Sequence, residues 1–579
     1  GQFMSREVHY EIFRRQGAKG GWVMHDAVNK RDMAISIAET LMADNQATGV
    51  KVVKESFDNE TGAYQSLKIF EDGHNKMKEE VAKEDAPGAL PCFKPDDLYS
   101  YHARSTMARL LAEHLGRQRL TVTELIHRGD ALEQLEATGT TYQHAVQKVA
   151  VAQAASTTMP VQQIVKKLND LATKAMNRVY TDEKRGYFPK AKEGQFAALA
   201  QKIAQESDKT YLFNGAIAHY LADASGWNEK LTRLLAILKE ADKNEDVADV
   251  LLGTVDSIGA EILAGSAALH ELIGESENLG AALWMLVHVF LGQPAEGTNS
   301  GIAAVTRHFK TDTLPAARTA IAGRILAELK SVKRLCPDSL VDELKTLRRI
   351  ANKLVLGQGK YLSHEDLIGA FTLRSKRLVT NEMVSEHLQE AGGVNEKVER
   401  LLLIEENIIG AENKRQLAKF FAPIITSPGF EQVYLFAKTP VLERLQRLVD
   451  LQKRVNRSGF QDVQKQEICD ALDKVACETE GRSKLLESIE AKSAGPIEKA
   501  TAILRLMTGG AITDGQLAER ARNMVLTYMG KPGFMSGYAA HLARTKGAIP
   551  DADVAMNDLM LTLEKAGITT EAGLRALAA

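Results

Sequence analysis

The stretch ASGWNEKLTRLLAI (residues 224–237) decides the fold class of most of the chain, because a second stretch nearly repeats it. AGGVNEKVERLLLI (residues 391–404) agrees with it at nine of fourteen positions without a gap. In both stretches leucine and isoleucine recur every three or four residues, which is the spacing of a buried helix face. Both stretches therefore predict amphipathic helices of one type.

Two further stretches extend the pattern. PVLERLQRLVDL (residues 440–451) keeps the glutamate, the arginine and the leucines, whereas GPIEKATAILRL (residues 495–506) echoes them faintly. The shared glutamates are Glu229, Glu396, Glu443 and Glu498. We expect duplicated helical units of about 47–56 residues, each packed against the next as in an α-solenoid or stacked bundle. Chance similarity among leucine-rich helices is the alternative, and it suffices for the fourth stretch alone.

Helical spacing continues through the rest of the chain from Leu98 onward. Gly, Pro and small polar residues divide it into helices of about 10–20 residues. Thr121-x-x-Glu124 and Ser363-x-x-Asp366 resemble capping boxes at helix starts. The most apolar run, residues 281–292, is shorter than the roughly 20 residues of a membrane span and predicts a buried core helix.

A different pattern occupies residues 1–72. Four runs rich in β-branched and aromatic residues flank one helical run, KRDMAISIAETLMA. The order β-β-α-β-β predicts a small antiparallel α+β domain in front of a mainly α chain. Residues 1–3 precede Met4, and we expect them to be foreign to the native sequence.

The hairpin VKESFDNETGAYQSLKIF (residues 53–70) gives this domain a predicted register. Asn59 and Gly62 suit a three-residue loop with a bulge. The register pairs Phe57 with Gln65, Glu55 with Leu67 and Val53 with Ile69. Phe57, Val53, Leu67 and Ile69 should then face the helix. The opposite face should carry Val52, Lys54, Tyr64, Lys68 and Phe70. This face should either form a docking surface for a partner or cover part of the helical body.

Residues 73–97 have linker composition, being charged at first and then interrupted by prolines. We expect a helical domain over residues 98–292 and a second over residues 299–579. The second should contain repeats related to residues 210–241.

Composition limits the class of protein. With 44% hydrophobic and 26% charged residues and a net charge of −2, the chain is typical of soluble globular proteins and has no global field to attract nucleic acid. The four scattered cysteines form no C-x-x-C pair, which favours buried reduced thiols and a cytoplasmic protein. We expect no membrane span, and the oligomeric state stays open.

Catalytic spacings are missing from the sequence. We find no phosphate-binding glycine loop, zinc-protease motif or nucleophile elbow. Glu124 and His127 have the spacing of one half of a di-iron site, but without a second pair a surface or capping role is favoured. His270, Glu271 and Glu275 are more typical of solvated charge at a helix end than of a zinc site. We therefore predict no catalytic, cofactor-binding or metal-binding residues.

A basic stretch is the remaining candidate for ligand binding. It consists of Arg444, Arg447, Lys453, Arg454 and Arg457. Arg447 and Arg454 are seven residues apart and so share a helix face. Together with 345–353 and 374–377 this stretch could bind an anionic ligand, although such helices are usually solvated or paired with acids.

Three functions are compatible with these features. The favoured one is a non-enzymatic scaffold or regulatory protein, whose helical array binds another protein and whose N-terminal module docks. An enzyme of unrecognised type, with its site in a cleft between helical halves, is the first alternative. A nucleic-acid-associated protein that uses the arginine-rich helix is the second.

Overall fold

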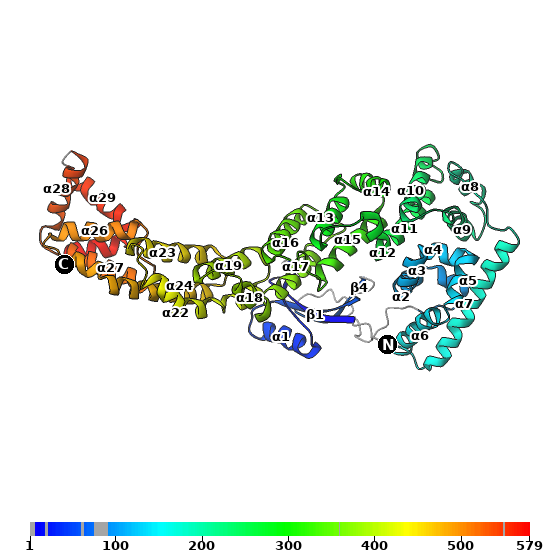
Figure 1. The fold of residues 1–579 in the computed structure, drawn as a ribbon, viewed down its shortest axis with the longest axis horizontal. Helices are drawn as coiled ribbons and strands as arrows, with labels where there is room; N and C mark the ends of the chain where they lie inside the picture. The colour runs from blue at the N-terminus through cyan, green and yellow to red at the C-terminus, as the bar shows by residue number, and fades with distance from the viewer. Residues whose placement is uncertain (1–5, 18–20, 59–62, 74–90, 358, 548–549) are drawn as a thin grey trace. The chain divides into compact units, whose positions relative to one another are not determined.

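The computed structural model describes residues 6–17, 21–58, 63–73, 91–357, 359–547 and 550–579. The chain is mainly helical and begins with a small four-stranded antiparallel sheet, which confirms the predicted fold class (Figure 1). It forms two compact units, residues 1–374 and 375–579.

The N-terminal module has the predicted β-β-α-β-β order. Its elements are β1 (Arg6–Arg15), β2 (Val23–Val28), α1 (Arg31–Ala43), β3 (Gly49–Asp58) and β4 (Ala63–Gly73). The strands are ordered β2-β1-β3-β4, and every neighbouring pair is antiparallel. The central pair β1–β3 therefore joins the two hairpins into one sheet.

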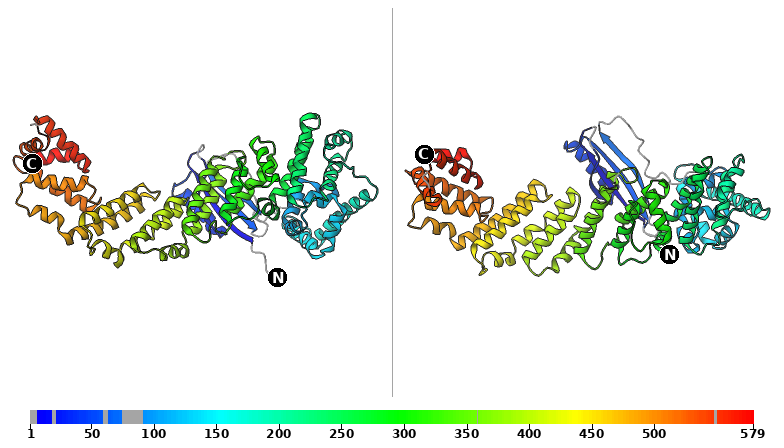
Figure 2. Two further views of the ribbon diagram at one scale, coloured as in Figure 1. Left: turned by 45° about the horizontal axis from the view of Figure 1, so that its top comes forward. Right: turned by 90° about the horizontal axis from the view of Figure 1, so that it is seen from above.

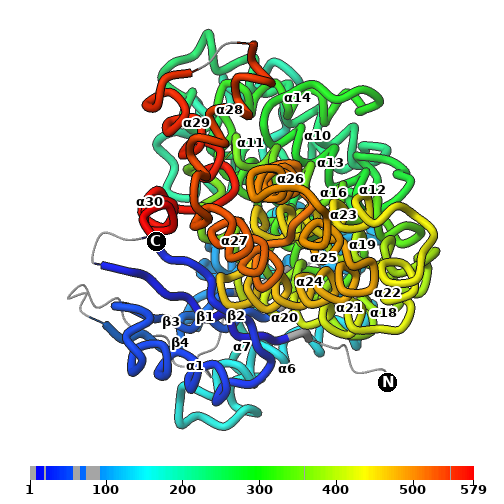
Figure 3. Tube along the Cα trace, turned by 90° about the vertical axis from the view of Figure 1, so that its left-hand side faces the viewer, coloured from blue at the N-terminus to red at the C-terminus, as the bar shows by residue number. Residues whose placement is uncertain are grey.

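Helix α1 covers one face of this sheet (Figure 3). Ala34, Ala38 and Leu41 of α1 are buried against alternate residues of the two central strands, among them Ile12 and Val52. Alternation along a strand places every second side chain on the same face. Val50 and Val52 of β3 thus belong to the small core.

The register predicted for the β3–β4 hairpin is right at one end and wrong at the other. Val52 lies opposite Phe70, which is the predicted offset, but Val53 lies opposite Lys68 instead of Ile69. The predicted pairs of Glu55 with Leu67 and Phe57 with Gln65 are likewise wrong, because Glu55 lies opposite Ser66 and Phe57 opposite Tyr64. A bulge between Val52 and Val53 changes the offset by one residue. The predicted turn, residues 59–62, lies outside the described residues.

The remaining elements of the first unit are helical. They are η1 (Pro95–Tyr99), α2 (Tyr101–Leu110), α3 (Ala112–Gln118), α4 (Val122–His127), α5 (Gly129–Ala137), α6 (Thr140–Ala154), α7 (Val161–Lys184), α8 (Phe196–Lys202), α9 (Lys209–Leu221), α10 (Trp227–Ile237), η2 (Leu238–Lys243), α11 (Ala248–Ala264), α12 (Ser266–Ile273), α13 (Leu279–Phe290), α14 (Ser300–Lys310), α15 (Pro315–Lys330), α16 (Leu340–Val355) and α17 (His364–Leu378), the last of which continues into the second unit.

The second unit is helical as far as it is described. Its further helices are α18 (Asn381–Gln389), α19 (Val394–Asn407), α20 (Ala411–Ala418), α21 (Phe421–Ile425), α22 (Pro428–Tyr434), α23 (Val441–Arg457), α24 (Asp462–Ser483), α25 (Leu485–Glu490), α26 (Pro496–Thr508), α27 (Gln516–Met529), α28 (Phe534–Lys546), α29 (Ala552–Lys565) and α30 (Thr570–Ala578).

Among the described residues, no single helix is long and apolar enough to cross a membrane. Helices α11 and α12 reach that length and composition only as a pair bent by 88°. The apolar run predicted as a core helix forms α13, whose Leu283, Val287 and Val289 are buried.

The two matching stretches form helices α10 and α19, and each is tied to the helix before it by the same contacts. Arg233 donates to the carbonyl oxygen of Tyr220 at 2.7 Å and to the Glu229 carboxylate at 2.8 Å. Arg400 donates to the carbonyl oxygen of His387 at 2.8 Å and to the Glu396 carboxylate at 3.2 Å. Each arginine thus ties the start of its own helix to the end of the helix before it.

The shared glutamates also cap their helices in the same way. The Glu229 carboxylate accepts from the backbone N–H of Ser225, and the Glu396 carboxylate from that of Gly392. These backbone hydrogen bonds lower the pKa of Glu229 to about 2 and also lower the pKa of Glu396. The carboxylates are therefore held ionised next to the arginines.

Candidate functional site

The face of the sheet opposite α1 is covered by helices of the first unit (Figure 2). This face carries buried charges. Lys330, at the end of α15, places its Nζ atom 3.6 Å from the Glu11 carboxylate and 3.4 Å from the Glu55 carboxylate. Lys51 also forms an ion pair with Glu365 of α17. The module is thus fixed to the helices by charge as well as by packing.

His9 and Ser66 complete this buried cluster. The imidazole Nε2 of His9 lies 3.2 Å from the Glu11 carboxylate, and the Ser66 hydroxyl donates to Glu55. His9, Glu11, Glu55 and Lys330 are each at most 4% exposed. One lysine therefore faces two carboxylates where little water can screen them.

The two carboxylates respond differently to this environment. Burial raises the pKa of Glu55 to about 7, although the Lys330 ammonium opposes the shift and the Glu11 charge adds to it. Burial also acts on Glu11, but the attraction of Lys330 and the hydrogen bond with His9 outweigh it, so the pKa of Glu11 lies below its usual value. The ammonium is consequently paired mainly with an ionised Glu11.

The four residues predicted to form a docking surface do not share one face. Phe70 packs against the core beneath α1, and Lys54 lies opposite Leu67 on that same side. Lys68 lies opposite Val53, on the face towards the helices, with its Nζ atom 2.7 Å from the Glu71 carboxylate. The side chain of Tyr64 lies outside the described part of the structure. The bulge accounts for this split.

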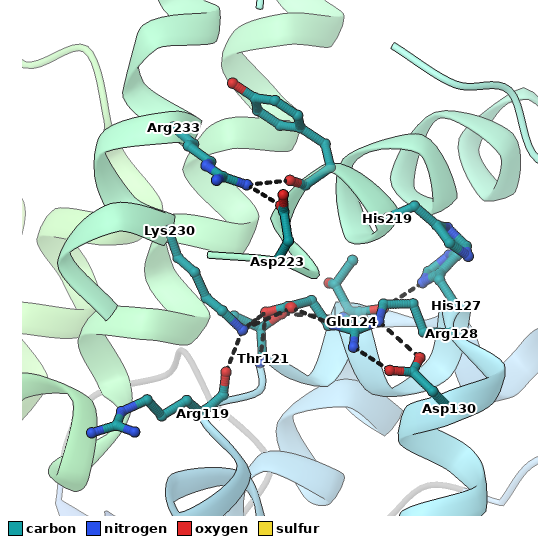
Figure 4. A network of polar contacts seen from close by, with 12 residues as sticks. Arg119, Thr121, Glu124, His127, Arg128, Asp130, His219, Asp223, Lys230 and Arg233 are labelled. Atoms are coloured by element: carbon teal, nitrogen blue, oxygen red, sulfur yellow. Dashed lines mark hydrogen bonds and ion pairs between the residues drawn. The ribbon is translucent and has the colours of Figure 1, made fainter. Parts of the chain in front are cut away.

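A second buried network joins helices α4 and α10 (Figure 4). The Thr121 hydroxyl accepts from the N–H of Glu124 at 3.1 Å, and the Glu124 carboxylate accepts from the N–H of Thr121 at 3.2 Å. This confirms the predicted capping box. The same carboxylate lies 2.8 Å from Lys230 Nζ and 2.9 Å from an Arg128 nitrogen.

Further contacts balance the charge of this network. Arg128 also pairs with Asp130 at 2.5 Å, and Lys230 donates to the carbonyl oxygen of Arg119 (Figure 4). Burial lowers the pKa of Lys230, against the attraction of Glu124. Glu124 is 0% exposed, so the expected surface position of this residue is wrong, whereas its capping role is right. The network is a structural tie between two helices.

His127 is enclosed beside this network. Its Nδ1 atom lies 2.6 Å from the carbonyl oxygen of Thr123, and its ring packs against those of Tyr99 and Tyr211, which also contact each other. Burial lowers its pKa to about 3, so the imidazole is neutral. Among the residues that the structure describes, no group of three or more His, Cys, Asp or Glu side chains could hold a metal ion.

The arginine-rich stretch forms α23, and much of its charge is used within the second unit. Arg444 donates to the carbonyl oxygens of Tyr434 and Thr439 at 2.5 and 2.9 Å. Arg447 pairs with Glu443 at 3.3 Å. In α23 it is therefore Arg444, and not Arg447, that ties the helix to the segment before it.

The remaining basic residues of α23 are divided between paired and exposed positions. Arg454 contacts the carboxylates of Glu399 and Glu406 on α19. Lys453 and Arg457 are exposed. Acidic partners thus neutralise both arginines that share the predicted face.

A groove of about 450 Å³ runs along α27 in the second unit. Its lining residues are Glu490, Gln516, Glu519, Arg520, Asn523, Met524, Thr527 and Tyr528. The positions on α27 recur every three or four residues and so belong to one helix face. The lining is polar with an aromatic ring, which suits hydrogen bonding to an extended or helical protein segment. No sequence motif marks this groove, because its residues are ordinary for the surface of a helix.

Comparisons with models of protein families, with curated proteins and with solved structures give no match to this chain.

Proposed function

We propose that the chain is a non-enzymatic binding or scaffold protein, whose C-terminal helical array presents a surface to another protein. The observation that carries this proposal is the recurrence of one closing contact between successive helices. Arg233 and Arg400 make it fully, whereas Arg447 keeps only the pair with the glutamate. The contact is complete in two units and partial in a third, which supports duplication of one helical unit. Arrays of stacked helical units commonly bind extended partners.

The groove on α27 is the surface we propose for the partner. It is concave, lies on a regular helix and exposes hydrogen-bonding groups from Glu519, Asn523 and Thr527. Interfaces of this kind combine polar contacts with an aromatic anchor, a role that Tyr528 would fill.

For the N-terminal module we propose a capping role in preference to docking. One face of its sheet is covered by α1, and the opposite face contacts α15 and α17. Deleting residues 1–75 would take the carboxylates of Glu11 and Glu55 away from Lys330 and uncover the helix surface that the sheet covers, so truncation would damage the first unit as well as remove the module. Point variants on exposed helix faces are therefore the better test.

We also propose a cytoplasmic location. The four cysteines are free thiols, which a reducing compartment favours.

Quantitative affinity capture from the native lysate tests the proposed function. The full chain is compared with a groove variant, Glu519→Lys/Asn523→Lys/Thr527→Lys, and with a control on α24, Glu467→Lys/Glu478→Lys. We expect a protein that the full chain and the control retain and the groove variant releases. Equal retention of the protein by all three chains would contradict the proposal that the groove binds the partner. Retention of nucleic acid that is lost in Arg447→Gln/Arg454→Gln and at high salt would favour the nucleic-acid alternative.

A further inference from the structure

Helices α2 and α4–α7 lie together at the N-terminal end of the helical body (Figure 1). Residues of these five helices and of η1 line an apolar cavity. Its volume is about 160 Å³. Side chains from every one of these helices line it, among them Met107, Leu125, Leu135, Val146 and Met176. The cavity is separate from the groove on α27 and from the buried charge networks.

The lining is mostly apolar, and its polar side chains are those of Tyr99, His102, Thr106, Tyr142 and Gln153. Among the described residues that line the cavity, none is Asp, Glu, Lys or Arg. The Tyr99 hydroxyl already donates to the carbonyl oxygen of Ile126 at 2.9 Å, and the Thr106 hydroxyl to that of His102 at 3.0 Å. A buried water needs two to four polar partners, so this space is better suited to hydrocarbon than to water.

The size of the cavity sets the size of its ligand. Protein interiors are close-packed, and an unfilled apolar space lowers stability in proportion to its volume. An apolar cavity of roughly 150 Å³ stays dry and accepts benzene. Ala145 and Ala172 leave room on two sides, and the flexible side chains of Met107 and Met176 can adapt to an occupant.

We propose that this cavity is a binding site for one uncharged hydrocarbon group, either an aromatic ring or an alkyl chain. The group belongs to a small neutral molecule or to an amphiphile whose charged end stays outside the cavity. The proposal does not depend on the partner groove, because the two sites lie in different units of the chain.

Methyl NMR of the full chain, with ¹³C-labelled methionine, tests this site. Toluene is the neutral probe and decanoate the amphiphile. We expect saturable shifts of the Met107 and Met176 methyl signals, assigned by Met→Leu substitution at each position. A response to toluene alone identifies a small neutral ligand, whereas tighter binding of decanoate identifies an alkyl chain. If neither probe shifts these two signals, the proposal is wrong.

Cavity-filling variants locate the binding. Ala145→Leu on α6 and Ala172→Leu on α7 each fill the space from a different helix and should weaken probe binding about tenfold or more. Gln147→Leu adds the same side chain at an exposed position of α6 and should leave binding unchanged. Unaltered binding in both filled variants would overturn the assignment, and using two variants guards against the misfolding of one.

Discussion

At the scale of residues, Arg233 and Arg400 explain why the two matching stretches resemble each other. Their side chains are 21% and 19% exposed, and each bonds a carbonyl oxygen of the preceding helix as well as a glutamate of its own. Arg447 is 46% exposed and keeps only the glutamate. The glutamate and arginine that the two stretches share are therefore the residues that tie each helix to the helix before it.

Replacing Arg233 or Arg400 by Gln should lower the free energy of unfolding of the unit concerned by about 1–3 kcal/mol, since a charge-assisted hydrogen bond to a carbonyl oxygen is lost. Arg447→Gln is the matched control and should cost less than about 0.5 kcal/mol. Thermal unfolding of the three variants measures these differences. Equal losses at all three positions would refute the closing role.

Glu55 makes stability depend on pH. Its pKa is raised from 4.5 to about 7, so between these values the folded chain keeps a proton that the unfolded chain has released. The free energy of unfolding contributed by this group therefore falls as the pH rises through that range. Burial beside Glu11 is the cause.

Glu55→Gln removes this titration and keeps the shape of the protonated side chain. Relative to wild type, the variant should gain roughly 1–3 kcal/mol between pH 5 and pH 8. Melting temperatures at both pH values measure the gain, with Glu71→Gln on the neighbouring strand as control. A difference between variant and wild type that does not change with pH would rule this explanation out.

At the scale of elements, the Glu124–Lys230 pair decides how α4 and α10 are joined. Lys230→Met would leave the fully buried Glu124 carboxylate with its ion pair to Arg128 and its hydrogen bonds from Thr121, and breaking a buried pair costs up to about 3–5 kcal/mol. Lys397→Met, at the equivalent position of the second stretch, should be nearly neutral. Denaturant unfolding tests both, and Glu124→Gln/Lys230→Met should recover part of the loss. Similar losses at Lys230 and Lys397 would contradict the structural role of the network.

The sheet shows what the sequence could predict about elements and what it could not. Runs of β-branched, aromatic and alternating apolar residues were sufficient to predict the four strands and helix α1 in their order along the chain. The bulge at Val52 and Val53 was not predictable, because no glycine or proline marks it. The buried cluster of His9, Glu11 and Glu55 was not predictable either, because the lysine that pairs with both carboxylates lies far along the chain at position 330.

At the scale of the whole molecule, helical periodicity was enough to predict a mainly α chain but not its candidate sites. The boundary between the two compact units falls within α17, between residues 374 and 375. The sequence there does not have the composition of a linker. The groove on α27 and the apolar cavity are built from side chains that are ordinary for exposed and buried helix faces. Only packing in three dimensions distinguishes them.

Site-specific photocrosslinking in native cells tests the proposed partner surface most directly. The photoreactive residue p-benzoylphenylalanine replaces Asn523 in the groove or, as a control, Glu478 on the exposed face of α24. We predict that the residue at position 523 crosslinks one discrete protein, and that the residue at position 478 does not crosslink this protein. The absence of any crosslinked macromolecule at position 523, or the same products from both positions, would contradict it.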